Sequence, residues 1–160
     1  MRRPILPTIA LALVLAAPAG ADDIKTAIDR FNLWNKCQPL MLVVEDLPND
    51  AAKIGLTREA IIAAVRSRLR AARLYSDQSR AYLYVNINVV GRAYNLSVEY
   101  NKLVKDLASG EIQSATTWDR SVTGTHGGND SGILSLVSQY MDRFIDEYLR
   151  VNTDACRSSN

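Results

Sequence analysis

Histidine and cysteine are scarce in this sequence, which contains one histidine, His126, and two cysteines, Cys37 and Cys156. A metal site with a single histidine needs several carboxylates brought together by tertiary structure. The sequence has no H-x-x-x-H, H-E-x-x-H or calcium-loop spacing that would indicate such a site. The two cysteines fit no zinc-binding spacing either. We therefore expect no metal and no other cofactor.

Motifs for nucleophilic catalysis and phosphate binding are also missing. There is no G-x-S-x-G elbow and no glycine-rich loop followed by Gly-Lys-Ser/Thr. An excess of one charge is absent too, because acidic and basic residues are equal in number once Arg2 and Arg3 are set aside. Nucleic-acid binding usually needs a basic excess. The composition thus argues against a nucleic-acid partner.

Long apolar runs are confined to the N-terminus. Arg2 and Arg3 precede a short apolar run over residues 9–17, and Ala19-Gly20-Ala21 follows with the small-x-small pattern of a signal-peptidase site. The run is shorter than the roughly 20 residues of a transmembrane helix, and no later run approaches that length. We predict a cleaved secretory signal over residues 1–21, a single α+β domain over 22–160 without a transmembrane segment, and a periplasmic or secreted location.

The two cysteines lie near opposite ends of the predicted mature chain. In an exported protein an even pair of cysteines is most simply a disulfide. We therefore predict a bond between Cys37 and Cys156, which would tie the first helix to the last.

Hydrophobic periodicity predicts three helices. The first begins near Asp23, ends at Cys37-Gln38-Pro39, and is expected to bury one apolar stripe. The second begins after Thr57 as its N-cap, and the third runs from about Ser131 to Asn152 with a broad apolar stripe. The predicted stripe of the first helix consists of Ile24, Ala27, Ile28, Phe31 and Trp34.

Four strands are predicted between these helices. Residues 40–47 form a continuous apolar run typical of a strand buried on both faces. Residues 82–90, 93–100 and 111–122 alternate apolar and polar side chains and are separated by short turns, so they predict an antiparallel meander. The element order α-β-α-β-β-β-α predicts an α+β two-layer sandwich with helices packed on one face of a mainly antiparallel sheet.

This order of elements, over about residues 38–152, resembles small exported domains with the order β-α-β-β-β-α. Examples are the N-terminal domain of TolB and the outer-membrane activators of penicillin-binding proteins. The resemblance implies the fold alone, since it includes no diagnostic motif and carries over no functional residue.

The segment around His126 has three interpretations. Glycines and helix-start residues favour a turn in which Asn129, Asp130 or Ser131 caps the last helix. Alternatively, His126 works with Asp119 or Asp130 and an unidentified nucleophile in a small exported hydrolase. A third interpretation is a loop that binds a small anion at the helix start.

Two surfaces are candidates for partner binding. Arg66, Arg70 and Arg73 fall at i, i+4 and i+7 and predict a basic stripe that faces an anionic surface or only solvent. Tyr84, Asn86 and Asn88 lie opposite the aliphatic face of their strand and predict an open sheet face, with or without a function. The expected function is a non-enzymatic binding or envelope-assembly module whose partner is an envelope protein, a glycan or an anionic surface.

Overall fold

The structure is a computed structural model that describes residues 21–158. Apart from Ala21, the predicted signal peptide lies outside the described residues. The elements in chain order are α1 (Ala21–Leu33), β1 (Met41–Val44), α2 (Asn49–Lys53), α3 (Arg58–Ala71), β2 (Tyr82–Val90), β3 (Ala93–Lys105), β4 (Ile112–Thr125), α4 (Ser131–Val151) and α5 (Thr153–Ser158).

The strands form one sheet in the order β1-β2-β3-β4. β2, β3 and β4 are antiparallel neighbours, as the alternating pattern predicts, and the β2–β3 reversal passes through Gly91 with a φ of 58°. β1 pairs with β2 in parallel, because α2 and α3 return the chain to the same end of the sheet. The sheet is therefore mixed but mainly antiparallel.

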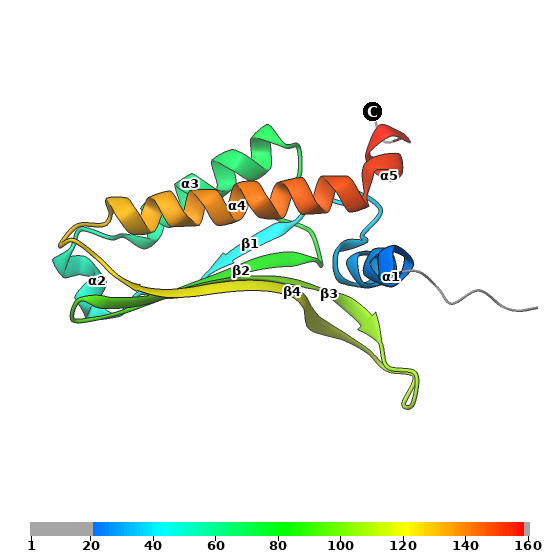
Figure 1. Ribbon diagram of the computed structural model, residues 1–160, viewed down its shortest axis with the longest axis horizontal. Coiled ribbons are helices and arrows are strands. Elements are labelled where there is room, and N and C mark those ends of the chain that lie inside the picture. Colours follow the sequence, from blue (N-terminus) through cyan, green and yellow to red (C-terminus); the bar gives the residue numbers. More distant parts are fainter. Residues whose placement is uncertain (1–20, 159–160) are drawn as a thin grey trace, which may run out of the picture.

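The helices α3 and α4 lie side by side on one face of the sheet (Figure 1). The two-layer α+β prediction is confirmed. The core lies between the layers, where alternate residues of β2 and β3 meet the apolar stripes of both helices. At its α1 end the core contains an aromatic cluster in which neighbouring ring centroids are 5.1–6.0 Å apart, formed by Tyr100, Trp118, Phe144 and Tyr148.

A bulge in β4 changes the alternation that the sequence predicts. Tyr100 pairs with Trp118 but Asn101 pairs with Thr116, so Thr117 is an extra residue. Beyond the bulge the two strands continue as a hairpin arm that extends past the rest of the sheet (Figure 1). Simple alternation would place Ile112 on the inner face together with Trp118. The bulge instead places Ile112 on the opposite face, where its side chain is exposed.

The predicted buried stripe of the first helix is wrong. Ile24, Ile28 and Phe31 are 55%, 52% and 65% exposed, although α1 forms where the sequence predicts a helix. The apolar spacing is that of an amphipathic helix, but the periodicity of one segment cannot specify whether another element will cover it.

Polar contacts hold α1 to the rest of the domain. Arg150 of α4 forms an ion pair with Asp29 at 2.8 Å, and the hydroxyl of Thr117 donates to the Asn32 carbonyl at 2.6 Å. Over residues 23–33 of this helix, Leu33 at its end is the one apolar side chain that is fully buried. The helix is thus attached by its polar side, and this leaves its apolar side facing outward.

The disulfide prediction is confirmed. Cys37 and Cys156 are bonded, with their Cα atoms 5.1 Å apart and 119 residues apart in the sequence. A loop of that length stabilises the folded chain by roughly 5 kcal/mol in the chain-entropy model. The bond fastens α5 to the turn that follows α1.

Candidate functional site

His126 is buried, and its ring is hydrogen-bonded to backbone groups. It follows β4 directly and is only 8% exposed. Its Nδ1 accepts a hydrogen bond from the Gly128 amide at 3.1 Å, so Nε2 carries the proton and donates to the Gly91 carbonyl at 2.9 Å. Both ring nitrogens are therefore engaged by backbone groups. The imidazole joins the β2–β3 turn to the loop before α4.

The structure does not bring Asp119 to His126. The two residues are seven positions apart along an extended strand, a distance of roughly 20 Å at the usual strand rise. Asp119 pairs with Glu99 across the sheet and its side chain is exposed. Asp130 lies nearer and contributes its carbonyl to the first turn of α4, where it accepts from Leu134 at 2.9 Å. Within residues 21–158, no group of three or more His, Cys, Asp or Glu side chains is arranged to hold a metal.

The loop before α4 is a turn with a helix cap. Asn129 Oδ1 accepts from the Ser131 amide at 3.3 Å and from its hydroxyl at 2.7 Å, so Asn129 is the one of the three candidate caps whose side chain satisfies a helix-start amide. Gly128 has a φ of 95°, a conformation that favours glycine. The geometry agrees with the interpretation of this segment as a turn and cap.

The basic stripe contains two of the three predicted arginines. Arg66 and Arg70 both place their guanidinium carbon 5.1 Å from the centroid of the Tyr75 ring. The Tyr75 hydroxyl donates to Asp77, and this hydrogen bond raises the pKa of Tyr75. The guanidinium groups of Arg66 and Arg70 on α3 thus both make a cation–π contact with the Tyr75 ring.

Arg73 departs from the predicted stripe. α3 ends at Ala71, and Arg73 adopts a φ of 58°. Its amide donates to Arg70 and the Leu74 amide donates to Leu69, the two hydrogen bonds of a Schellman cap. Such a cap usually has glycine at the left-handed position, so an arginine there gives no signal that the helix has ended.

The predicted open sheet face is uncovered by helices (Figure 1). Tyr84, Asn86 and Asn88 of β2 are partly or fully exposed on it and pair with Glu99, Ser97 and Asn95 of β3. On β4, the residues paired with these three residues of β3 are Asp119, Ser121 and Thr123. The amide of Asn95 donates to the Thr123 hydroxyl at 3.1 Å. Three strands therefore present a surface of amides, hydroxyls and carboxylates.

Tyr84 has a perturbed hydroxyl at one border of this face. It donates a hydrogen bond to Glu45, which follows β1, and that bond raises the pKa of Tyr84 to about 12. The Tyr84 hydroxyl is thus a hydrogen-bond donor to the Glu45 carboxylate.

A cleft of about 590 Å³ lies at the α1 end of the molecule. It is bordered by the turn after α1, the segment before β2 and the start of the hairpin arm, and Trp34, Arg80 and Lys102 are among its lining residues. The Lys102 ammonium donates to the carbonyls of Phe31 and Trp34, the latter at 3.1 Å. Burial lowers the pKa of Lys102. The lining contains these two cations and no carboxylate.

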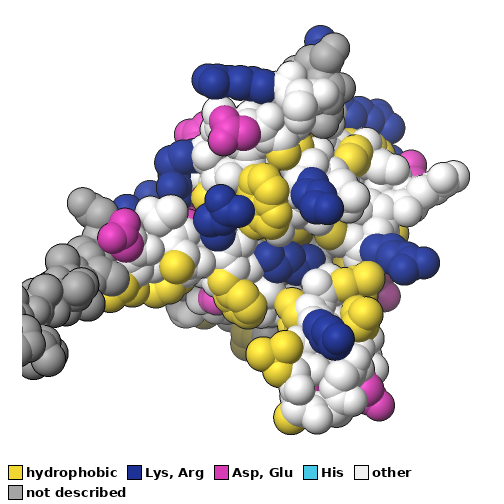
Figure 2. All heavy atoms as spheres, turned by 90° about the vertical axis from the view of Figure 1, so that its right-hand side faces the viewer, with side chains coloured by type: hydrophobic (Ala, Val, Ile, Leu, Met, Phe, Trp, Pro, Cys, Tyr) yellow, Lys and Arg dark blue, Asp and Glu magenta, His cyan; other side chains and the backbone are white. Residues whose placement is uncertain are grey.

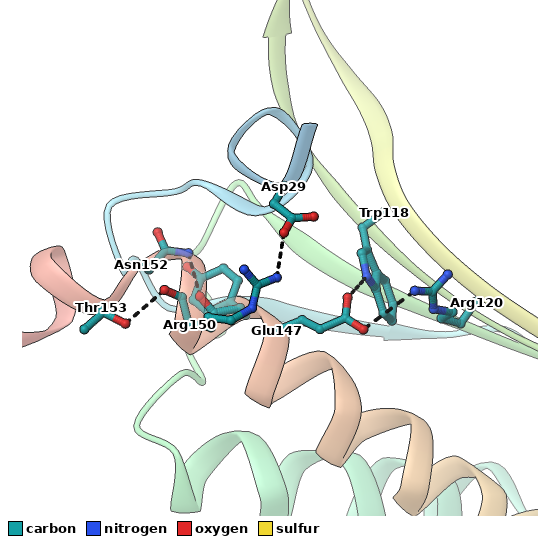
Figure 3. A network of polar contacts seen from close by, with 8 residues as sticks. Asp29, Trp118, Arg120, Glu147, Arg150, Asn152 and Thr153 are labelled. Atoms are coloured by element: carbon teal, nitrogen blue, oxygen red, sulfur yellow. Dashed lines mark hydrogen bonds and ion pairs between the residues drawn. The ribbon is translucent and has the colours of Figure 1, made fainter. Parts of the chain in front are cut away.

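A polar network at the C-terminal end of α4 has no counterpart in the sequence-based predictions (Figure 3). Glu147 accepts from the Trp118 indole at 2.8 Å and pairs with Arg120 at 3.6 Å.

Asn152 is fully buried, and both the oxygen and the nitrogen of its side-chain amide form hydrogen bonds. Its Oδ1 accepts from the amides of Asn35 and Cys37, and its Nδ2 donates to the carbonyls of Leu33 and Tyr148, at distances of 2.9–3.2 Å.

Comparison with known proteins identifies no family. No family model matches the chain, and no curated protein matches it. Among solved structures, the rare lipoprotein B from Shewanella oneidensis is similar with a TM-score of 0.28 and 14% identity, covering 71% of this chain and 97% of that chain. A minor lipoprotein from Acinetobacter baumannii has a TM-score of 0.23 and 12% identity, covering 74% and 89%. Likeness at this level carries no functional argument.

Proposed function

We propose that this chain is an exported, non-enzymatic module that binds a polar partner of the cell envelope through its open sheet face. The observation that carries the proposal is the composition of that face. Amides and hydroxyls of three adjacent strands stand in register on it, together with the carboxylates of Glu99 and Asp119, while the helices occupy the other face. Such groups recognise the hydrogen-bonding groups of an envelope protein or a glycan.

Export is supported by two independent features of the chain. The N-terminal sequence has the basic, apolar and small-x-small parts of a secretory signal. Cys37 and Cys156 form a disulfide, and disulfides are typical of proteins that fold in an oxidising compartment. None of the helices over residues 21–158 combines the length and the hydropathy of a membrane-spanning segment.

The geometry around His126 favours a binding module over the hydrolase alternative. A general base needs a ring nitrogen that faces the reacting group, and both nitrogens of this imidazole are within hydrogen-bond distance of backbone groups. We expect His126→Ala to lower the melting temperature, because it unties two loops, and to leave partner binding intact.

Site-specific photo-cross-linking in the producing cell tests this function. A photoreactive amino acid at Asn88, on the open face, should give a discrete adduct. The same amino acid at Gln139, exposed on α4 in the opposite layer, serves as the matched control and should not. Introducing bulk and charge beside the probe with Asn86→Arg should remove the adduct.

Several results would contradict the proposal. They are no adduct at Asn88, an adduct at Gln139 of the same mass and yield, or an adduct that persists in a folded Asn86→Arg protein. If a folded His126→Ala protein gave no adduct, the His126 imidazole would be needed for partner binding.

A further inference from the structure

Exposed apolar side chains are concentrated at one end of the molecule. Seven large apolar residues are exposed within the described chain, and six of them lie on α1 or on the hairpin arm. The seventh, Val90, lies at the opposite end of the sheet, next to the β2–β3 turn. The six are Ile24, Ile28 and Phe31 on α1, and Leu103, Leu107 and Ile112 on the arm.

The arm carries its apolar residues outward. Leu107, in the turn at its tip, is 93% exposed, and Ile112 is 61% exposed. Ile112 pairs with Lys105 across the arm, so an apolar side chain stands beside a cation. The tip is a turn in which Asp106 accepts from the amides of Ala108 and Ser109 at 2.8 and 2.7 Å. The arm therefore ends in a hydrogen-bonded turn that exposes Leu107 between the acidic residues Asp106 and Glu111.

The cleft with Arg80 and Lys102 lies between the turn that follows α1, the segment before β2 and the base of the arm. In the view onto this end, Lys and Arg side chains stand among the apolar ones (Figure 2). The Lys102 ammonium donates to carbonyls of α1 and the following turn, and it also lies 5.7 Å from the centroid of the Phe31 ring. Trp34 lines the same cleft, and tryptophan is favoured at the boundary between lipid headgroups and acyl chains.

We propose that this end of the molecule docks onto the surface of an anionic lipid bilayer, with α1 and the tip of the arm inserted among the headgroups and the cleft holding a lipid phosphate. The charge pattern selects this occupant, because the cleft is lined by two cations without a carboxylate. Its shape points the same way. Apolar groups that project from a helix and from a separate arm, with cations between them, fit a deformable headgroup layer better than the surface of a second folded protein.

The attachment of α1 explains how its apolar side remains available. The Lys102, Thr117 and Arg150 side chains hold polar groups of this helix or of the turn that follows it. The hydrogen bonds leave Ile24 and Ile28 exposed, and Phe31 is 65% exposed although the Lys102 ammonium lies 5.7 Å from the centroid of its ring. This surface is distinct from the open sheet face, so the docking inference does not depend on the partner proposed for that face.

Vesicle binding by the purified, disulfide-bonded protein tests the inference. The probes are vesicles of phosphatidylethanolamine with phosphatidylglycerol, and vesicles of phosphatidylcholine alone. We expect co-sedimentation with the anionic vesicles, weaker binding to the neutral ones, and a loss of affinity as salt is raised. Trp118 is buried, so a blue shift of tryptophan emission on binding would report Trp34 at the interface.

Matched variants locate the surface. Phe31→Gln and Leu107→Gln should each weaken binding to anionic vesicles by about tenfold, since each removes one large apolar side chain from the inserted surface. Arg80→Gln should weaken binding and reduce its salt dependence. Val90→Gln is the control, because Val90 is 66% exposed and Phe31 is 65% exposed, yet Val90 lies at the far end of the sheet.

The inference is overturned if the wild-type protein does not bind the anionic vesicles, or if Val90→Gln weakens binding as much as Phe31→Gln does. A wild-type dimer that dissociates on Phe31→Gln, together with no vesicle binding, would assign this surface to a second copy instead. Retention of the circular-dichroism spectrum by each variant excludes unfolding as the cause.

Discussion

Replacing Asn152 by alanine is expected to lower the free energy of unfolding by about 3 kcal/mol. The side chain is buried and makes four hydrogen bonds. The Tyr148 carbonyl keeps a partner after truncation, because the Asn152 amide also donates to it. The amides of Asn35 and Cys37 and the carbonyl of Leu33 lose theirs. Three buried or half-buried groups at about 1 kcal/mol each give the expected loss.

Urea denaturation of the oxidised protein measures this loss, with Thr153→Ala as the control. Thr153 is adjacent in sequence, and its hydroxyl donates to the carbonyl of Leu149 and to that of Arg150 (Figure 3). Its removal should cost less than about 1 kcal/mol. A loss below about 1 kcal/mol for Asn152→Ala would refute the reasoning, because the four bonds of Asn152 would then contribute no more than the half-buried Thr153 hydroxyl.

Asn152 and the disulfide restrain the same turn, so their contributions should not be additive. Lys36 and Cys37 have φ values of 52° and 56°, which is an unfavourable conformation for residues other than glycine. With both cysteines replaced by serine, this turn can relax, and Asn152→Ala should then cost less than it does in the oxidised protein. Equal costs in the two backgrounds would show that the two restraints act independently.

Two further predictions concern covalent and titration properties. The protein recovered from cells should begin at Asp22 and contain no free thiol, which intact mass before and after reduction with alkylation determines; two alkylated thiols in the unreduced, denatured protein would contradict the disulfide. Burial raises the pKa of Tyr148 to about 12, whereas a tyrosine in an unfolded chain titrates near 10. The folded state therefore has the full benefit of the neutral phenol below about pH 10 and loses it as the pH rises toward about 12. Urea denaturation across this range should show the decline, and a folded protein in which every tyrosine titrates near pH 10 would contradict it.

The meander and the two long helices could be predicted from the sequence because their patterns are local and agree with their tertiary environment. β2 alternates over its whole length and occupies the predicted residues, 82–90. Thr57 caps α3 as expected, accepting from the Ala60 amide at 3.1 Å. The broad stripe of α4 is buried against the sheet, as its width indicates.

The remaining features depend on contacts that a single segment does not encode. The bulge at Thr117 places a hydroxyl on a carbonyl of α1, a partner 85 residues away. Asn152 looks like an ordinary polar residue at the end of a helix, although it binds the backbone of the turn after α1. The position of Arg73 was mispredicted because a Schellman cap formed without glycine.

The candidate site divides in the same way. The sequence could be searched for catalytic and metal-binding motifs, because each such motif is a short pattern within one segment. In the structure both ring nitrogens of the single histidine are hydrogen-bonded to backbone groups. Its partner Gly91 is 35 residues away, so the sequence could not reveal this role. The exposed end of the molecule was missed because the pattern of α1 specifies an apolar face without specifying its neighbour.

The two proposed surfaces have a definite spatial relation. The arm and α1 lie at one end of the strands, and the β2–β3 turn lies at the other (Figure 1). A bilayer that meets the arm therefore meets the strands end-on rather than on their open face. Asn86 and Asn88, toward the far end of β2, then remain clear of the lipid. The polar composition of that face is consistent with this orientation, since a face laid against acyl chains would leave its amides without partners. The geometry thus allows one domain to rest on a membrane by its end and bind a polar partner by its side.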